Sequence, residues 1–222
     1  MLKSGLYVSC QARDDNPLRG ANFMVAMARA AVQGGASAIR AEGPTDIRAI
    51  KGAVDLPVIG LWKLDIEDYD VYITPTLESA EAVARAGADI IALDATDRPH
   101  PEGNTAEFIG AVKNELGRPV FADVSTFEEG LAAAEAGADY VSTTMAGYTP
   151  YTEKTNGPNL KLVRDLAAAV KIPVIAEGRF WTPEQVAQAF ALGAHGVVVG
   201  TAITNPRDIT KRFFDAVPKE KR

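Results

Sequence analysis

The chain has 222 residues, a formal net charge of −6 and the hydrophobic share of an ordinary globular protein, 47%. This length favours one α/β domain over residues 1–222 with a single large core. The negative charge argues against the broad basic surface that nucleic-acid binding needs, so we expect no nucleic-acid partner. Cys10 is the only cysteine, which excludes an internal disulfide and a thiolate-rich metal site.

The N-terminal residues enter an apolar strand-like run without the long apolar stretch and cleavage site of a secretory signal. Apolar runs elsewhere stay well short of the ~18 to 20 residues that cross a bilayer. The sequence therefore predicts a cytoplasmic protein with no membrane partner.

Eight short apolar segments alternate with helix-like segments along the chain. Four of them follow a Gly-Ala pair that closes an Ala-rich helix, and three others open with a proline, at Pro57, Pro119 and Pro173. Their nearly continuous apolar character is typical of a buried parallel sheet. The predicted strands span residues 6–10, 38–41, 58–61, 89–94, 119–123, 140–143, 174–177 and 196–199.

This alternation of strand and helix predicts a (β/α)8 TIM barrel. An open, doubly wound sheet is the alternative, although the glycine fingerprint that usually accompanies it is missing. Helix starts are marked by Thr126 with Glu129 and by Thr182-Pro183 with Gln185. The segment 145–158 after the sixth strand has the aromatic and glycine content of a lid, and a plain surface loop explains it equally well.

The residues that follow the predicted strands are mostly polar. In a barrel the carboxyl ends of all strands meet at one mouth, so these side chains are expected to line a common site. Some of them are equally explained as salt bridges that close the end of the barrel. The ring consists of Gln11, Arg40, Lys63, Asp94, Asp123, Thr143, Glu177 and Gly200.

Glycines follow the seventh and eighth strands, in Gly178-Arg179 and in Gly200-Thr201. Barrels commonly bind a phosphate group at these two strand ends through backbone N–H groups and a helix N-terminus. Each glycine alone is most often a turn residue, but the two together predict a phosphate site. The Walker A pattern is absent, so a nucleoside triphosphate is not implied.

Lys63 directly follows an apolar strand, which places it at the predicted mouth. A lysine acts as a base near neutral pH only when burial or a neighbouring cation, here Arg40, lowers its pKa. A close Glu177 would oppose that shift, and the two groups would then titrate together. The alternative interpretation is an ordinary surface lysine at a strand end.

The two histidines contribute little to the predicted site. His195 lies at the end of the barrel opposite the mouth and is interpreted as structural. His100 shares one loop with Asp94 and Asp97, but three ligands from one loop are weak grounds for a metal site, and we predict none.

Seven ordered segments, spread over almost the whole chain, resemble the N-acetylmannosamine-6-phosphate 2-epimerase family of bacterial sialic acid catabolism (NanE type), whose barrel is of the ribulose-phosphate-binding kind. The segments are LYVSCQ (6–11), AIRAEG (38–43), IGLWK (59–63), ADIIALDATDRP (88–99), STTMAGYT (142–149), AEGR (176–179) and GTAIT (200–204). The resemblance implies an isomerase that interconverts N-acetylmannosamine 6-phosphate and N-acetylglucosamine 6-phosphate without a metal or an organic cofactor.

By the same resemblance, Lys63 is the catalytic acid/base and Glu177 its partner. The expected substrate contacts are Gln11, Arg40, Asp123, Thr143 and Arg179, and the expected phosphate contacts are Gly147, Gly178, Gly200, Thr201 and Arg207. The sequence departs from the family in two places. The family commonly has an arginine where this chain has Asn205, followed by Arg207, and Trp62 replaces a smaller aliphatic residue, so that its ring either reshapes the pocket floor or packs outward.

Inverting carbon 2 of an open-chain amino sugar requires removal of its proton and its return on the other face. Our hypothesis is that Lys63 moves this proton, that Glu177 either orients Lys63 or serves as a second acid/base, and that donors near Gln11, Arg40 and Lys63 stabilise the enolate. Two alternatives remain: a Schiff-base aldolase with Lys63 as nucleophile, and a noncatalytic sugar-phosphate sensor.

The C-terminal segment 208–217 has apolar residues at helical spacing, among them Ile209, Phe213 and Phe214. This stripe predicts a homodimer formed through the C-terminal helix, or else a helix that caps its own barrel.

Overall fold

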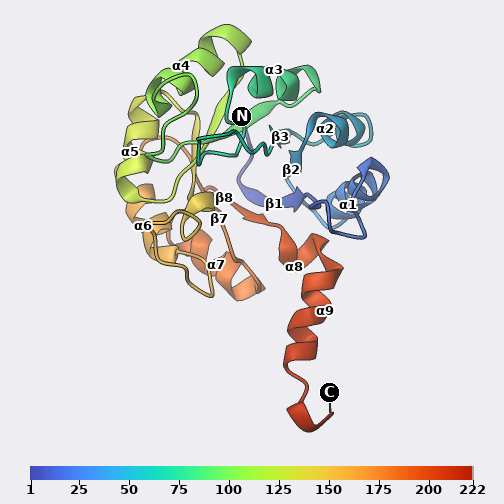
Figure 1. The fold of residues 1–222 in the computed structure, drawn as a ribbon. Helices are drawn as coiled ribbons and strands as arrows, with labels where there is room; N and C mark the ends of the chain where they lie inside the picture. The colour runs from blue at the N-terminus through green and yellow to red at the C-terminus, as the bar shows by residue number, and fades with distance from the viewer. Residues whose placement is uncertain (222) are drawn as a thin grey trace.

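A computed structural model describes residues 1–221, and residue 222, the last of the predicted domain, lies outside them. Eight parallel strands close into a barrel in chain order, each paired with the next and β8 paired with β1 (Figure 1). The predicted (β/α)8 barrel is therefore confirmed, and the open sheet is wrong. The strands are β1 (Gly5–Cys10), β2 (Ala38–Glu42), β3 (Val58–Leu61), β4 (Ile90–Asp94), β5 (Val120–Asp123), β6 (Tyr140–Ser142), β7 (Val174–Glu177) and β8 (Gly196–Val199).

Helices surround the barrel as an outer ring (Figure 1). They are α1 (Ala21–Gln33), α2 (Pro44–Lys51), α3 (Leu77–Arg85), α4 (Thr105–Leu116), α5 (Phe127–Glu135), α6 (Leu160–Ala169) and α7 (Pro183–Ala191), followed by α8 (Thr201–Thr204) and α9 (Pro206–Asp215). Two 3-10 turns, η1 (Thr143–Met145) and η2 (Lys219–Lys221), complete the elements. Over residues 1–221, none of these helices has the length and apolar character to cross a membrane.

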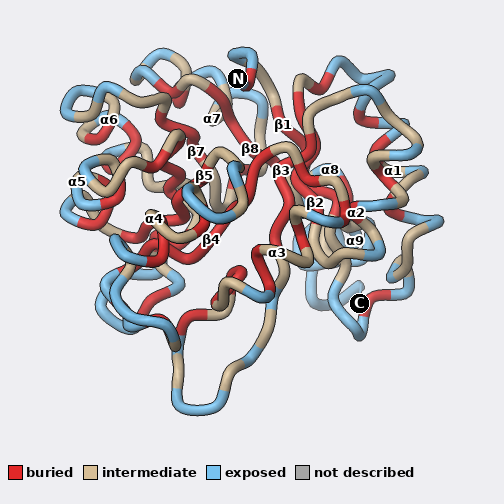
Figure 2. The backbone as a smooth tube through the Cα atoms, turned by 90° about the horizontal axis from the view of Figure 1, so that it is seen from above, coloured by how far each residue is buried: buried red, intermediate tan, exposed pale blue. Residues whose placement is uncertain are grey.

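The buried residues lie along the strands and on the inward sides of the helices (Figure 2). Alternation along each strand divides them between the barrel interior and the space between strands and helices. Tyr7, Ile59 and Phe121 belong to the cluster that fills the barrel, whereas their neighbours along the strands pack against the helices. The ring of Tyr7 occupies the space beside Gly196, where a Cβ atom would lie 2.5 Å from it. This filled interior forms the floor beneath the mouth.

The helix starts follow the sequence signals. Thr126 accepts a hydrogen bond from the N–H of Glu129, and Thr182 accepts one from Gln185, with Pro183 in the first turn. These capping boxes fix where α5 and α7 begin, and they also fix where the loops from β5 and β7 end. The ends of those two strands carry Asp123 and Glu177.

The C-terminal helix α9 extends away from the ring of helices (Figure 1). None of its residues is buried, and the side chain of Phe213 is 74% exposed. Arg212 lies over the ring of Trp181, 4.6 Å from its centroid, near the start of α7. The apolar stripe therefore does not cap its own barrel.

Candidate active site

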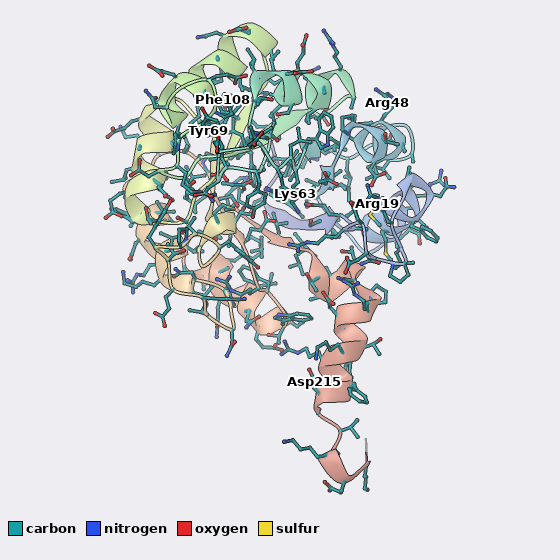
Figure 3. The ribbon with its side chains drawn as sticks, in the orientation of Figure 1. Arg19, Arg48, Lys63, Tyr69, Phe108 and Asp215 are labelled. Carbon is teal, nitrogen blue, oxygen red and sulfur yellow. The ribbon has the colours of Figure 1, made fainter. Side chains whose placement is uncertain are left out.

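The mouth of the barrel is lined by inward-facing residues at the ends of strands β1 to β7. Because alternate residues of a strand face inward, the position of Arg40 on β2 places Glu42 on the same side. Lys63 follows β3 and lies inside the ring of helices (Figure 3). Asp123 ends β5 and Glu177 ends β7, so residues far apart in sequence share one opening.

A buried ion-pair network joins Arg40, Asp123 and Glu177. Arg40 Nη1 and Nη2 donate to the two carboxylate oxygens of Asp123 at 3.0 and 2.5 Å, a bidentate pair. Arg40 Nη1 also lies 3.0 Å from Glu177 Oε2. The Arg40 side chain is 1% exposed, its guanidinium stacks over Phe121 at 5.1 Å, and its Nε has no hydrogen-bond partner among the described residues. The predicted gathering of Arg40, Asp123 and Glu177 is thus what the structure shows.

Lys63 belongs to a separate chain of hydrogen bonds. Its Nζ donates to Gln11 Oε1 at 2.7 Å, and Gln11 Nε2 donates to Ser9 Oγ at 2.9 Å. The backbone N–H of Lys63 donates to Glu42 Oε1 at 3.3 Å. Both ends of the Gln11 side-chain amide are thus hydrogen-bonded within the protein, the oxygen to Lys63 and the nitrogen to Ser9. Gln11 therefore orients the Lys63 amine, the group predicted to transfer the proton.

The pKa of Lys63 is lowered, first by burial and then by the positive charges of Arg40 and Arg13. Glu42 and, more weakly, Glu177 oppose that shift. Solvent reaches the Lys63 side chain, yet enough protein surrounds the amine for burial to be the largest cause of its lowered pKa. The sequence predicted both the direction of the shift and the role of Arg40 in it.

Burial raises the pKa of Glu177 to about 7, with Asp123 adding to the shift. Arg40, Thr144 and Lys63 oppose it. The group therefore changes charge close to neutral pH, as an acid/base residue must. Glu177 and Lys63 influence each other's pKa, which is expected of two groups at one mouth.

Thr144 is a member of the mouth that the sequence analysis missed. Its hydroxyl donates to Asp123 Oδ1 at 2.5 Å and lies 3.2 Å from Glu177 Oε2. Thr143, which was predicted instead, is buried, and its hydroxyl bonds the backbone C=O and N–H of Glu177. Thr144 lies in η1, just past β6, and the inward alternation of Tyr140 and Ser142 continued by one step was the signal available. Thr143 as a substrate contact stays a prediction.

Arg179 braces the loop after β6. Its Nη2 donates to the carbonyl of Ala146 at 2.6 Å, its Nε donates to the carbonyl of Gly157 at 3.2 Å, and its guanidinium lies 5.0 Å from the ring centroid of Tyr148. Gly147 has φ +77°, and a Cβ there would lie 2.8 Å from Arg179 Nη2, so glycine is required at this contact. The Arg179 side chain thus holds both ends of the loop together, and a substrate contact from it stays a prediction.

The predicted phosphate residues at β7 and β8 lie at the mouth. Gly178 has φ +110° directly after β7, and Gly200 directly precedes Thr201, the exposed first residue of α8. Arg207 lies farther along, on α9, where it pairs with Asp15 at 3.0 Å and with Asp208 at 3.5 Å. Its charge is therefore already balanced by two carboxylates, and its role at a phosphate stays a prediction.

Four other residues singled out from the sequence make contacts that hold the fold together. Trp62 packs against the outer core layer, so its ring faces the helices and not the pocket. Asp94 is paired with Arg98 at 2.7 Å, and the ring nitrogens of His100 lie 3.1 and 2.8 Å from the carbonyls of Pro75 and Asp94. His195 contacts the carbonyl of Leu2 near the amino end of β8. Within residues 1–221 no group of three His, Cys, Asp or Glu residues is placed to hold a metal ion.

Residues 24–219 match the model of the NanE family, N-acetylmannosamine-6-phosphate epimerase. The chain belongs to the N-acetylmannosamine-6-phosphate 2-epimerase family. A relative of that name from Caldanaerobacter subterraneus subsp. tengcongensis is 50% identical over 223 residues, covering 100% of this chain and 94% of the relative. Another, from Clostridium perfringens, is 48% identical and covers 97% of both chains. Membership in this family identifies the chain as an isomerase, an epimerase.

A solved structure agrees with this assignment to the 2-epimerase family. The N-acetylmannosamine-6-phosphate 2-epimerase from Clostridium perfringens superimposes with a TM-score of 0.94 at 47% identity, covering 97% of this chain and 94% of that one. Thiamine phosphate pyrophosphorylase from Pyrococcus furiosus, with a TM-score of 0.60 at 24% identity and coverage of 93% and 90%, shares the fold alone.

Proposed function

We propose that this member of the 2-epimerase family interconverts N-acetylmannosamine 6-phosphate and N-acetylglucosamine 6-phosphate in amino-sugar and sialic acid catabolism. One observation carries the proposal: Lys63, with a lowered pKa, shares a barrel mouth with Glu177, whose pKa is raised to about 7. An amine whose pKa is lowered by its surroundings and a carboxyl whose pKa is raised to about 7 are suited to the proton transfer that carbon 2 needs.

The substrate phosphate is placed at the ends of β7 and β8, beside Gly178 and the start of α8 at Thr201. The open-chain sugar then reaches across the mouth toward Lys63 at the end of β3. This orientation sets carbon 2, the reacting atom, near Lys63 and leaves the phosphate at the opposite side. The binding energy of the phosphate is available to hold carbon 2 in place.

Lys63 in its uncharged form removes the proton from carbon 2, and the electron pair moves into an enolate that ends on oxygen 1. The resulting ammonium and the buried charge of Arg40 stabilise that enolate. Return of a proton to the opposite face of carbon 2 completes the inversion. Gln11 holds the amine in position through its hydrogen bond to Nζ.

Glu177 is proposed as the partner of Lys63, in one of two roles that deuterium labelling separates. Its own hydrogen bonds are to Arg40 and Thr144, which fix its carboxylate on the β7 side of the mouth. As a second acid/base, Glu177 serves the opposite face of carbon 2, and product then carries deuterium while recovered substrate carries little at early times. If Glu177 instead only sets the charge of Lys63, then Lys63 alone exchanges the proton of carbon 2 with solvent deuterium.

The reaction is placed in the cytoplasm, because sugar phosphates are charged metabolites that do not cross membranes unaided.

The test is proton NMR of the purified protein with N-acetylmannosamine 6-phosphate in deuterated water. We expect signals of N-acetylglucosamine 6-phosphate to appear with deuterium at carbon 2. A product fully protonated at carbon 2 would exclude exchange with protein groups, and no conversion of either epimer would overturn the proposed function.

A further inference from the structure

Tyr72 lies at the mouth, on a segment that folds back against the end of β3. Lys63 and Ile73 form an antiparallel bridge, the carbonyl of Tyr72 accepts a hydrogen bond from Leu64 N–H at 3.0 Å, and Thr74 N–H donates to the carbonyl of Trp62 at 2.7 Å. These bonds involve both neighbours of Lys63. The backbone of Tyr72 is therefore held in a fixed position relative to the proposed acid/base.

The turn at Thr74 maintains this arrangement at a cost in backbone strain. Thr74 is β-branched and fully buried, yet its φ is +46°, a region that such residues rarely adopt. Its hydroxyl compensates by donating to the carbonyl of Ala92 at 2.7 Å and accepting from Trp62 N–H at 3.1 Å. A strained turn that fixes the residues around Lys63 is consistent with a precisely placed site.

The hydroxyl of Tyr72 is poorly satisfied within the protein. Its partner among the described residues is Met145 Sδ at 3.5 Å, and a thioether sulfur is a weak acceptor. Half-buried hydroxyl groups normally find a stronger acceptor. Burial, with the nearby carboxylates of Asp94 and Asp123, raises the pKa of Tyr72 to about 12, so the hydroxyl keeps its proton and is a donor.

We propose that Tyr72 recognises the 2-acetamido group of the substrate, with its hydroxyl donating to the acetamido carbonyl. The inference rests on the proposed function and names one specificity contact in that site. Met145 is fully buried next to the hydroxyl of Tyr72, so the half-buried ring of Tyr72 itself is the apolar surface proposed for the acetamido methyl group. A hydroxyl donor next to an apolar surface matches an amide carbonyl next to a methyl group.

The charges around Tyr72 and its position beside Lys63 both favour the acetamido group as its partner. Asp94 and Asp123 act on Tyr72 electrostatically, but each is paired with an arginine. The surroundings of the hydroxyl therefore carry little net charge, which suits a neutral acceptor. The acetamido group is attached to carbon 2, the atom on which Lys63 is proposed to act. Backbone hydrogen bonds hold the segment that carries Tyr72 against the residues on either side of Lys63. A substrate whose carbon 2 lies at Lys63 therefore brings the acetamido group on that carbon close to Tyr72.

The experiment compares two open-chain ligands that lack the aldehyde and cannot react. They are 2-acetamido-2-deoxymannitol 6-phosphate and mannitol 6-phosphate, and their Kd values are measured by titration calorimetry with wild type and with Tyr72→Phe. We expect Tyr72→Phe to weaken the acetamido ligand by about two- to tenfold, the range of one neutral hydrogen bond, and to leave mannitol 6-phosphate unchanged. The loss is specific to one ligand, which a general change of structure would not produce.

Tyr69→Phe is the matched control, since Tyr69 lies in the same connection between β3 and α3, and both of its Kd values should equal those of wild type. The removed hydroxyl of Tyr72 contacts only a sulfur among the described side chains, so the Tyr72→Phe chain should melt at the wild-type temperature. An equal change for both ligands, or no change for either, overturns the inference. Failure of the proposed function would give a different result: the wild-type protein would neither convert N-acetylmannosamine 6-phosphate nor bind either ligand.

Discussion

Arg40 Nη1 lies 3.0 Å from Glu177 Oε2, an ion pair that joins β2 to β7 across the mouth of the barrel. Asp123 completes the network through its bidentate bond to the same guanidinium. Three strands of one closed sheet thus fix the positions of a cation and two carboxylates. Beside them, in the segment that follows β3, lies the amine of Lys63, whose pKa the guanidinium lowers.

Replacing Lys63 tests its assignment as the acid/base. Lys63→Met should lower kcat by about 10²- to 10⁴-fold, since a positioned acid/base contributes that much. Stability should change little, because solvent reaches the side chain and no buried partner is lost. Lys171→Met, an exposed lysine just before β7 at the amino end of the barrel, is the control and should keep wild-type turnover. Turnover within threefold of wild type in Lys63→Met would end the assignment.

Borohydride trapping addresses the aldolase alternative for the same residue. In the proposed mechanism Lys63 moves a proton and forms no covalent bond with substrate, so reduction in the presence of substrate should add no mass to the protein. Mass spectrometry of the intact chain measures this. A substrate-dependent adduct at Lys63 would favour the Schiff-base reaction.

The pH dependence of kcat/KM should follow the charges around Lys63. Arg40, Arg13, Glu42 and Glu177 act on this amine, and Glu42 raises its pKa. Removing that charge in Glu42→Gln lowers the pKa of Lys63, so the uncharged amine persists to lower pH. The limb of the profile that reports Lys63 should therefore move to lower pH, while Glu115→Gln, on the outer surface of α4, should leave it in place. A shift toward higher pH would contradict this assignment of charges.

Glu177→Gln should stabilise the fold above neutral pH. The pKa of Glu177 is raised from 4.5 to about 7 in the folded state, so its contribution to stability is full below pH 4.5 and is lost as pH rises to about 7. Its side chain is 13% exposed, and the penalty at pH 8 is on the order of 3 kcal/mol. Thermal melts at pH 8 should show Glu177→Gln melting above wild type, with the two converging near pH 5. A lower melting temperature at pH 8 would mean that the ion pair with Arg40 outweighs burial.

Strand positions were predictable because each strand is a short apolar run bounded by glycine or proline. Pro57, Pro119 and Pro173 each lie directly before an observed strand, and the predicted bounds agree with the structure to within about one residue. Closure of the barrel then placed the residues after the strands at one mouth, which is why Arg40, Asp123 and Glu177 were predicted together. Period two along a strand, applied more strictly, would have chosen Thr144 over Thr143.

Contacts made by loops could not be predicted from the sequence. Nothing in the pattern around Tyr72 indicates that its segment folds back to pair with Lys63, because that pairing depends on the turn at Thr74 and on hydrogen bonds to two neighbouring strands. Arg179 was expected to contact the substrate, and its contacts with the carbonyls of Ala146 and Gly157 follow only from the path of the loop after β6.

We propose that α9 forms a homodimer contact. Phe213 is 74% exposed on a helix that extends from the barrel, and large exposed apolar side chains on such a surface favour association. Light scattering should give twice the chain mass for wild type, and Phe213→Asp should shift it toward the monomer. Lys211→Asp, which changes charge on the same helix without removing apolar surface, is the control. A monomeric wild type at micromolar concentration would contradict the proposal.

The rate at which deuterium enters carbon 2 tests the central claim most directly. Each epimer is incubated separately in deuterated water with wild type, Lys63→Ala and Glu177→Gln, and carbon 2 is followed by proton NMR. We expect exchange with epimerisation in wild type and no epimerisation in folded Lys63→Ala. If Glu177→Gln still exchanges the carbon 2 proton of one epimer but not that of the other, Glu177 is the second acid/base. Epimerisation by Lys63→Ala at a rate near that of wild type would contradict the account.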